Sequence, residues 1–240
     1  MNEIAIVIGL GEIGKPLFEV IKEKYETYGI DKEEKEVEGP CDIMHICYPY
    51  EIDDFIQTTI NYIEKYQPNL TVINSTIIPG TTRQIYNSTE KLIVHSPIRG
   101  KHRKMKEELL HYTKYIGGVT KEASALAAKH FHSLGMKTKV LDTPETTELA
   151  KLSATTYFGL LIAWAQEVER YCEQLSIDYD QVVSFYEEIG YLPPVKYFPG
   201  EIGRHCIMPN IKILQRIFES DILNTIQNSN EMKKNRRQLN

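Results

Sequence analysis

The most constraining feature of the sequence is a glycine-rich loop close to its start. Gly9-Leu10-Gly11-Glu12-Ile13-Gly14 follows the apolar run "EIAIVI" and leads into the amphipathic segment "KPLFEVIKEKY". The order of strand, glycine loop and helix is typical of a dinucleotide site. The first glycine permits a tight turn, the second admits a pyrophosphate and the third lets the helix pack closely, while free N–H groups at the helix start attract the anion.

An acidic residue follows the loop at the distance that a dinucleotide site requires. "TYGID" is predicted to be the second strand, and its Asp31 lies about 20 residues beyond Gly11, where a carboxylate binds a ribose diol. A carboxylate there would repel a 2'-phosphate, so we expect NAD rather than NADP. The alternative is a structural turn followed by a solvated charge. The expected cofactor residues of this region are Gly9, Gly11, Glu12, Ile13, Gly14 and Asp31.

Short apolar runs alternate with amphipathic stretches through the first half of the chain. The runs read as strands, and their alternation with helices predicts an α/β fold with a doubly wound parallel sheet. The predicted strands are "EIAIVIGLG", "TYGID", "DIMHICYP", "LTVINST", "KLIVHSP", "TKYIGG" and "KTKVLD".

The second half of the chain changes to a helical pattern after Leu141. Residues 144–175 predict one long helix, with Asp142 and Thr143 as cap candidates and Pro144 at the first helical position. "SIDYDQVVSFYEEIG" and "PNIKILQRIFESDILNTIQ" predict further helices, and the polar end "NSNEMKKNRRQLN" is interpreted as a frayed terminus. We expect a dinucleotide-binding domain at 1–142 and a small all-α domain at 143–240.

Composition excludes several classes of partner. The net charge of -5 gives no reason to expect a nucleic-acid partner. No apolar run approaches the roughly 18 residues that cross a bilayer, and no signal peptide is recognised, so we expect a cytoplasmic protein with no membrane partner. The four cysteines lack metal-ligand spacing, so we expect free thiols and no metal.

Several motifs together resemble those of a known enzyme family. "CDIMHICYP", "VINSTIIPGTTRQI", "YIGGVTKEA" and "ETTELAKLSATTYFGLLIAWAQEVERYCEQLSIDYDQV" resemble, in order and spacing over about residues 3 to 210, the nucleotide-sugar dehydrogenases of the UDP-glucose and GDP-mannose dehydrogenase type. The resemblance implies a Rossmann domain, a long central helix and a helical domain that forms homodimers. The family's third domain, which binds the nucleotide of the sugar, is not expected because the chain ends where it should begin.

The resemblance also implies NAD-dependent oxidation of a primary alcohol and roles for individual residues. Ser75 and Thr76 fall where the family contacts the nicotinamide end of the cofactor, and Tyr48 and Pro49 are further expected cofactor residues. Lys151 falls on the family's catalytic lysine, which stabilises an oxyanion; the alternative is a surface lysine paired with Glu148. β-Hydroxyacid dehydrogenases also use a lysine early in their interdomain helix, so Lys151 indicates dehydrogenase chemistry more than one substrate.

Three positions depart from the family pattern. Ile98 replaces a glutamate, Thr155 an asparagine one helical turn after the lysine, and Asn210 an aspartate after the family's cysteine. Hydrolysis of a thioester needs an activated water, and the carboxylates that would assist are absent from their expected places. Thr155 is nevertheless expected to assist Lys151, because residues at i and i+4 share a helix face.

Cys206 falls on the family's nucleophile and stands in "FPGEIGRHCIMPN". Neighbouring His205 and Arg204 would favour its thiolate form if they also lie close in space. Cys206 is expected to be a nucleophile if the reaction passes through an acyl intermediate, and a wall of the substrate pocket if the chemistry stops after one hydride. His205 is expected to contact substrate.

A basic cluster, "SPIRGKHRKMK", follows a predicted strand at residues 96–106. Ligands of doubly wound sheets bind beyond the carboxyl ends of the strands, so Arg99 and His102 are expected to bind an anionic substrate. The alternative is a solubilising helix start, although cations there oppose the helix dipole.

These observations favour an NAD-dependent oxidoreductase acting on the alcohol or carbonyl of an anionic small molecule. Two alternatives use the same crevice. One is a transferase, for example an S-adenosylmethionine-dependent methyltransferase, because an acid that binds ribose suits adenosyl ligands too. The other is a protein that binds NAD without catalysis.

Overall fold

The computed structural model describes residues 3–31, 37, 39–100, 104–190, 199–203 and 207–237. The chain divides into two compact units, Met1–Lys151 and Leu152–Asn240. His102, His205 and Cys206 lie outside the described residues.

The first unit is built on a sheet of seven strands in the order β2-β1-β3-β4-β5-β6-β7. Neighbouring strands are parallel except β5 and β6, so the predicted α/β fold is confirmed with one antiparallel pair. A short helix connects β5 to β6, so β6 runs back beside β5 in the opposite direction. A parallel pair would need a longer crossover connection. The strands are β1 Ile4–Ile8, β2 Glu26–Ile30, β3 Ile43–Ile46, β4 Leu70–Ile73, β5 Ile93–His95, β6 Lys114–Gly118 and β7 Thr138–Leu141.

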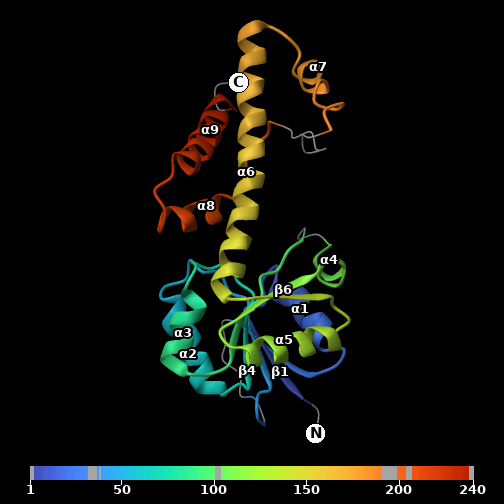
Figure 1. The fold of residues 1–240 in the computed structure, drawn as a ribbon, viewed down its shortest axis with the longest axis vertical. Coiled ribbons are helices and arrows are strands. Elements are labelled where there is room, and N and C mark those ends of the chain that lie inside the picture. Colours follow the sequence, from blue (N-terminus) through green and yellow to red (C-terminus); the bar gives the residue numbers. More distant parts are fainter. Residues whose placement is uncertain are drawn as a thin grey trace. The chain divides into compact units, whose positions relative to one another are not determined.

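Helices cover both faces of the sheet (Figure 1). On one face lie α1 (Gly14–Ile21), α4 (Met105–His111) and α5 (Lys121–Ser133), and on the other lie α2 (Phe55–Tyr66) and α3 (Thr81–Thr89). Alternate residues of β1 belong to the two cores, with Ala5 and Val7 in one and Ile6 and Ile8 in the other. Because both faces are buried, this strand reads as an unbroken apolar run.

The long helix predicted from the sequence is confirmed as α6, Pro144–Leu175. Thr143 caps it, because its hydroxyl oxygen accepts from the backbone N–H of Thr146 at 3.2 Å. Within the first unit, Glu145 in its first turn forms an ion pair with Arg83 of α3 at 2.5 Å. The helix start is thereby fixed to the layer that covers the sheet.

In the second unit α6 is joined by α7 (Tyr179–Ser184), α8 (Ile207–Gln215) and α9 (Asp221–Arg237). The segment predicted to form one helix from Pro209 is two helices, and the expectation of a frayed terminus is wrong, because α9 extends to Arg237. Polar contacts hold it: the Ser229 hydroxyl donates to Gln166 Oε1 at 2.8 Å, and Asn230 Oδ1 accepts from the N–H of Ile202 at 2.8 Å.

No helix in the described part of the chain is long and apolar enough to cross a membrane.

Candidate functional site

The glycine loop between β1 and α1 has the geometry that its spacing predicts. Gly9 has φ +90°, and a Cβ there would lie 2.7 Å from the backbone N of Tyr48. A Cβ on Gly14 would lie 1.7 Å from the carbonyl oxygen of Gly9, whereas a Cβ on Gly11 would meet nothing within 4 Å. The first and third glycines are therefore required by the fold, and the middle one leaves its side open to a ligand.

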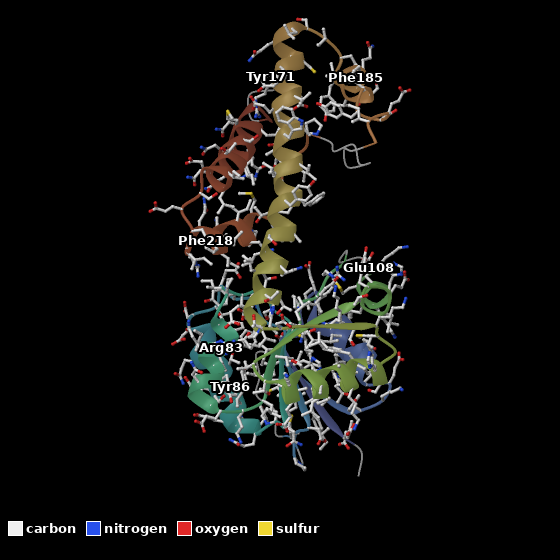
Figure 2. All side chains as sticks on the ribbon, in the orientation of Figure 1. Arg83, Tyr86, Glu108, Tyr171, Phe185 and Phe218 are labelled. Carbon is white, nitrogen blue, oxygen red and sulfur yellow. The ribbon has the colours of Figure 1, made fainter. Side chains whose placement is uncertain are left out.

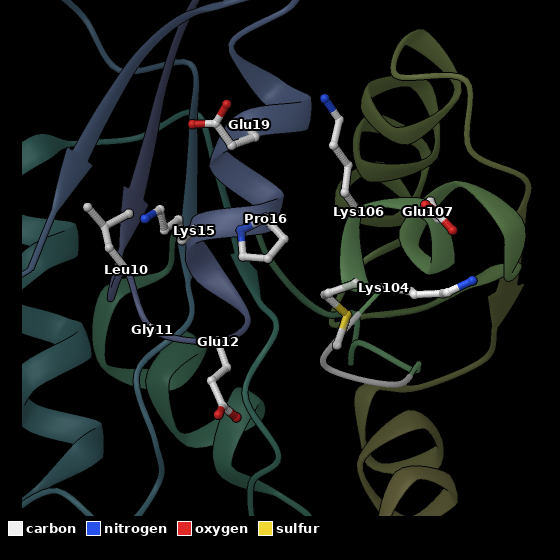
Figure 3. A pocket seen from close by; sticks show the side chains of 10 residues that line it. Leu10, Gly11, Glu12, Lys15, Pro16, Glu19, Lys104, Lys106 and Glu107 are labelled. Carbon is white, nitrogen blue, oxygen red and sulfur yellow. The ribbon is translucent and has the colours of Figure 1, made fainter.

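A cavity of about 690 Å³ lies beside this loop. Leu10, Gly11 and Glu12 line it with Lys15 of α1, and the start of α4, 104–107, faces them (Figure 3). The open side of Gly11 thus adjoins space of the size that small-molecule sites occupy.

Asp31 lies directly after β2 and is exposed. Its Oδ1 accepts from the backbone N–H of Leu10 at 3.4 Å, which keeps the carboxylate beside the glycine loop. Open space at Gly11 next to a helix start, with a carboxylate alongside, fits the pyrophosphate and ribose of a dinucleotide. Glu12 and Ile13 belong to the loop between Gly11 and Gly14.

The ends of β3 and β4 meet next to the loop. The Ser75 hydroxyl donates to the carbonyl oxygen of Tyr48 at 2.5 Å, and the Tyr48 hydroxyl lies 2.6 Å from Oγ1 of Thr59. Pro49 is exposed and Thr76 half-buried. The structure therefore brings Gly9, Tyr48 and Ser75 together, although they are far apart in the chain.

His95 connects this strand end to α6. Burial lowers the pKa of His95 to about 3, so the ring is neutral. Its Nε2 lies 3.1 Å from the carbonyl oxygen of Ser75 and its Nδ1 lies 2.8 Å from the hydroxyl of Thr147. Because a carbonyl can only accept, Nε2 carries the proton and Nδ1 accepts from Thr147.

Lys151 ends the first unit on α6, with its Nζ donating to the carbonyl oxygen of Ile98 at 2.7 Å. Glu148 is fully buried and binds the start of α3, accepting from the backbone N–H groups of Gly80 at 2.6 Å and Thr82 at 3.0 Å. Desolvation raises the pKa of Glu148. Its carboxylate thus caps a helix, and Lys151 is held on the loop that follows β5.

Arg99 belongs to that same loop. Its guanidinium donates to the carbonyl oxygen of Thr113 at 2.8 Å and lies over the rings of Tyr112 and Tyr115, at 5.4 and 4.7 Å from their centroids. These contacts orient Arg99 against the start of β6.

Thr155 belongs to the second unit. Its hydroxyl donates to the carbonyl oxygen of Leu152 at 2.9 Å and accepts from Nδ2 of Asn210 at 2.9 Å. Two of the positions that depart from the family pattern therefore contact each other.

Comparison with known proteins finds a family match in the second half of the chain. The sequence pattern of the UDP-glucose/GDP-mannose dehydrogenase family, central domain, matches residues 145–235. This region is therefore similar to the central domain of that family. The resemblance inferred from the sequence motifs is confirmed.

Curated relatives extend the similarity beyond that region. A UDP-N-acetyl-D-mannosamine dehydrogenase of Methanococcus vannielii is 29% identical over 172 residues, covering 70% of this chain and 38% of the relative. One from Methanococcus maripaludis is 27% identical over 253 residues, covering 84% and 58%. The chain spans about half the length of these relatives.

The fold is also similar to that of a solved structure. The solved UDP-N-acetylmannosamine dehydrogenase of Pyrococcus horikoshii matches 95% of this chain with a TM-score of 0.82 and 20% identity, and 68% of that structure is covered.

Sequence reasoning missed a set of buried polar residues behind the strand ends. Lys114, at the start of β6, donates to the carbonyl oxygen of Ser96 at 2.7 Å and to Oδ1 of Asn74 at 3.4 Å. Burial lowers the pKa of Lys114 to about 7. The sequence contained one indication of this network, because His45 and His95 interrupt otherwise apolar strands. A polar residue in a buried strand needs a hydrogen-bond partner.

Proposed function

We propose that the protein is an NAD-dependent oxidoreductase that acts on the alcohol or carbonyl of an anionic small molecule, with a nucleotide-linked sugar as the preferred class. The observation that carries the proposal is the glycine loop with its open middle position and Asp31 alongside. Asp31 would bind the adenosine ribose, and the loop 9–14 would receive the pyrophosphate on the N–H groups of the α1 start.

The relatives support this proposal over its alternatives. The two curated Methanococcus relatives are named as dehydrogenases of a nucleotide-linked sugar. An S-adenosylmethionine-dependent transferase would use the same loop and Asp31, but neither of these two relatives is named as a transferase. The remaining alternative is a protein that binds NAD without catalysis, and a measurement of substrate turnover tests it.

At the nicotinamide end we propose that Ser75 and Thr76 border the ring, with Tyr48 and Pro49 beside them. NAD supplies an acceptor for the hydride that leaves the alcohol carbon. Lys151 would hold the proton or stabilise the oxyanion at the substrate oxygen, because an ammonium near a positively charged ring gives up its proton more readily than in water. Thr155, one turn further along α6, would assist.

The residues proposed to bind the substrate are inferred from the sequence. Arg99, His102 and His205 are proposed to bind the anion, and Cys206 to form a thiohemiacetal if an aldehyde is oxidised further. Replacing Cys206 with Ser would then abolish carboxylate formation and leave NAD binding intact, whereas unchanged carboxylate formation would remove Cys206 from the mechanism.

We also propose a homodimer formed through α6, with 1–142 as the cofactor domain and 143–240 as the dimerisation and substrate domain. Tyr157, Trp164 and Tyr171 recur every seven residues and are 54%, 52% and 46% exposed. Figure 2 labels Tyr171 on this helix. A seven-residue apolar stripe is the pattern that packs against another helix.

The proposal is tested by following NADH absorbance when purified protein is mixed with NAD and UDP-N-acetylmannosamine or UDP-glucose. We expect turnover with at least one of them, lost in Lys151→Met and retained in Lys121→Met, which changes an exposed lysine of α5. Lys151→Met with wild-type turnover would contradict the role given to Lys151. NAD binding without turnover on any substrate would favour the non-catalytic alternative.

A further inference from the structure

We propose that Lys114 is a positioning residue for the nicotinamide end of the cofactor site, because it binds the residues that follow β4 and β5 at the same time. This inference rests on the proposed function. It assigns a role to a lysine other than Lys151, and to a network whose members come from separate segments of the sequence.

Lys114 is almost fully buried, with 4% of its surface exposed. Besides Ser96 and Asn74, its ammonium faces the ring of Phe131, 4.8 Å from the centroid. A buried cation is expensive unless its donors are used, so these three contacts determine where the ammonium lies. Lys114 thereby connects β6 to the ends of two neighbouring strands.

Asn74 transmits this contact to the proposed cofactor residues. It immediately precedes Ser75, whose hydroxyl binds Tyr48 and whose carbonyl oxygen binds His95. The backbone N–H of Asn74 donates to the carbonyl oxygen of Ile46 at 2.8 Å. The Asn74 side chain and the Ser75 loop are therefore held by separate contacts that converge on one strand end.

The direction of the hydrogen bonds shows that Lys114 orients Asn74. In its protonated form Lys114 can only donate, so Oδ1 of Asn74 faces Lys114 and its Nδ2 faces Nδ1 of His45, at 3.2 Å. His45 is neutral because burial lowers its pKa. Nδ1 of His45 must then accept, which places the proton on Nε2.

The hydrogen bonds run in the same direction, from donor to acceptor, to the other end of the network. Nε2 of His45 donates to Nε2 of His130 at 3.0 Å, and Nδ1 of His130 donates to the Tyr25 hydroxyl at 3.0 Å. The Tyr25 hydroxyl then donates to Oγ of Ser133 at 2.8 Å. The orientation of the Asn74 amide, which Lys114 and the carbonyl oxygen of Val72 both bind, thus fixes both histidine tautomers. Tyr25 lies at the end of the network away from Ser75.

The network could instead contribute to stability alone. That alternative predicts that substitution of Lys114 or of Tyr25, at the two ends of the network, lowers stability and changes the affinity for different ligands equally. The positioning role predicts that only the Lys114 end affects ligand binding, and only for ligands that reach the Ser75 loop. NADH has a nicotinamide, whereas ADP-ribose has the same adenosine, pyrophosphate and second ribose without it.

The test is calorimetric titration of wild type, Lys114→Met, Lys114→Arg and Tyr25→Phe with NADH and with ADP-ribose, with thermal unfolding of each variant. We expect Lys114→Met to weaken NADH binding by about tenfold or more and to leave ADP-ribose binding within about twofold of wild type. Lys114→Arg should restore part of the NADH affinity because it keeps the donors. Tyr25→Phe should lower the melting temperature and change neither affinity.

Equal weakening of both ligands in Lys114→Met, or unchanged NADH binding in a folded Lys114→Met protein, would overturn the positioning role. If Lys114→Met does not fold, Asn74→Leu replaces it with the same expected discrimination. Wild-type protein that binds neither ligand would refute the proposed cofactor instead, which separates the two failures.

Discussion

At the scale of residues, the glycine loop was the most predictable part of the site. Backbone atoms lie so close to Gly9 and Gly14 that no larger residue fits at either position. The GxGxxG spacing of dinucleotide sites predicts glycine at both. The partners of Ser75 and Asn74 could not be predicted, because His95, Lys114 and His45 approach them only once the strands pair. Sequence marks such residues as polar interruptions in apolar strands and does not say which of them meet.

The loop offers a matched pair of substitutions. Gly11→Ala should leave the free energy of unfolding within about 0.5 kcal/mol of wild type, because a Cβ there meets nothing within 4 Å. It should nevertheless weaken NADH binding by about tenfold or more. Gly14→Ala should destabilise by about 1 to 3 kcal/mol or more, since its Cβ overlaps Gly9. Denaturant unfolding and NADH titration measure both effects; equal stability losses would contradict the geometry.

The buried histidines predict acid sensitivity. Burial lowers the pKa of His95 and of His130 from 6.5 to about 3. Between these values the unfolded chain binds protons that the folded chain does not, so their contribution to stability is present above pH 6.5 and is lost as pH falls toward 3. For each of the two histidines, the free energy of unfolding should fall by about 1.4 kcal/mol for every pH unit by which the pH is lowered in that window.

Urea unfolding in steps from neutral pH downward checks this expectation. His130→Gln should unfold with a shallower pH dependence than wild type, and His132→Gln, which changes an exposed histidine of α5, should follow wild type. A His130→Gln protein with the wild-type pH dependence would contradict the buried neutral ring.

At the scale of elements, α6 was predicted with both its ends, because proline, a threonine cap and helical spacing agree. The division between α8 and α9 had a weaker signal in Ser220, whose hydroxyl lies 3.5 Å from the N–H of Leu223. The helical end of α9 was missed because it is held by Ser229 and Asn230, which a search for apolar periodicity overlooks.

The stripe on α6 gives a test of association. Trp164→Glu should convert a dimer to a monomer in light scattering at micromolar concentration, because a carboxylate would be buried opposite its own copy. Leu126→Glu, an equally abrupt change at an exposed position of α5, should leave the mass unchanged. A wild-type monomer, or a Trp164→Glu protein that remains dimeric, would count against association through this helix.

At the scale of the whole molecule, the α/β sheet and the long helix followed from the alternation of apolar runs and from the change of pattern after Leu141. The antiparallel β6 did not, because strand direction depends on where the connection passes rather than on the strand's own residues. The assignment of 1–142 to the cofactor and 143–240 to dimerisation and substrate stays a prediction.

The decisive measurement for the dehydrogenase assignment is calorimetric titration of wild type, Asp31→Ala and Asp142→Ala with NADH, NADPH and S-adenosylmethionine. We predict that wild type and Asp142→Ala bind NADH in preference to NADPH, and that Asp31→Ala binds NADH about tenfold more weakly or worse. Binding of S-adenosylmethionine without binding of NADH would contradict the dehydrogenase assignment.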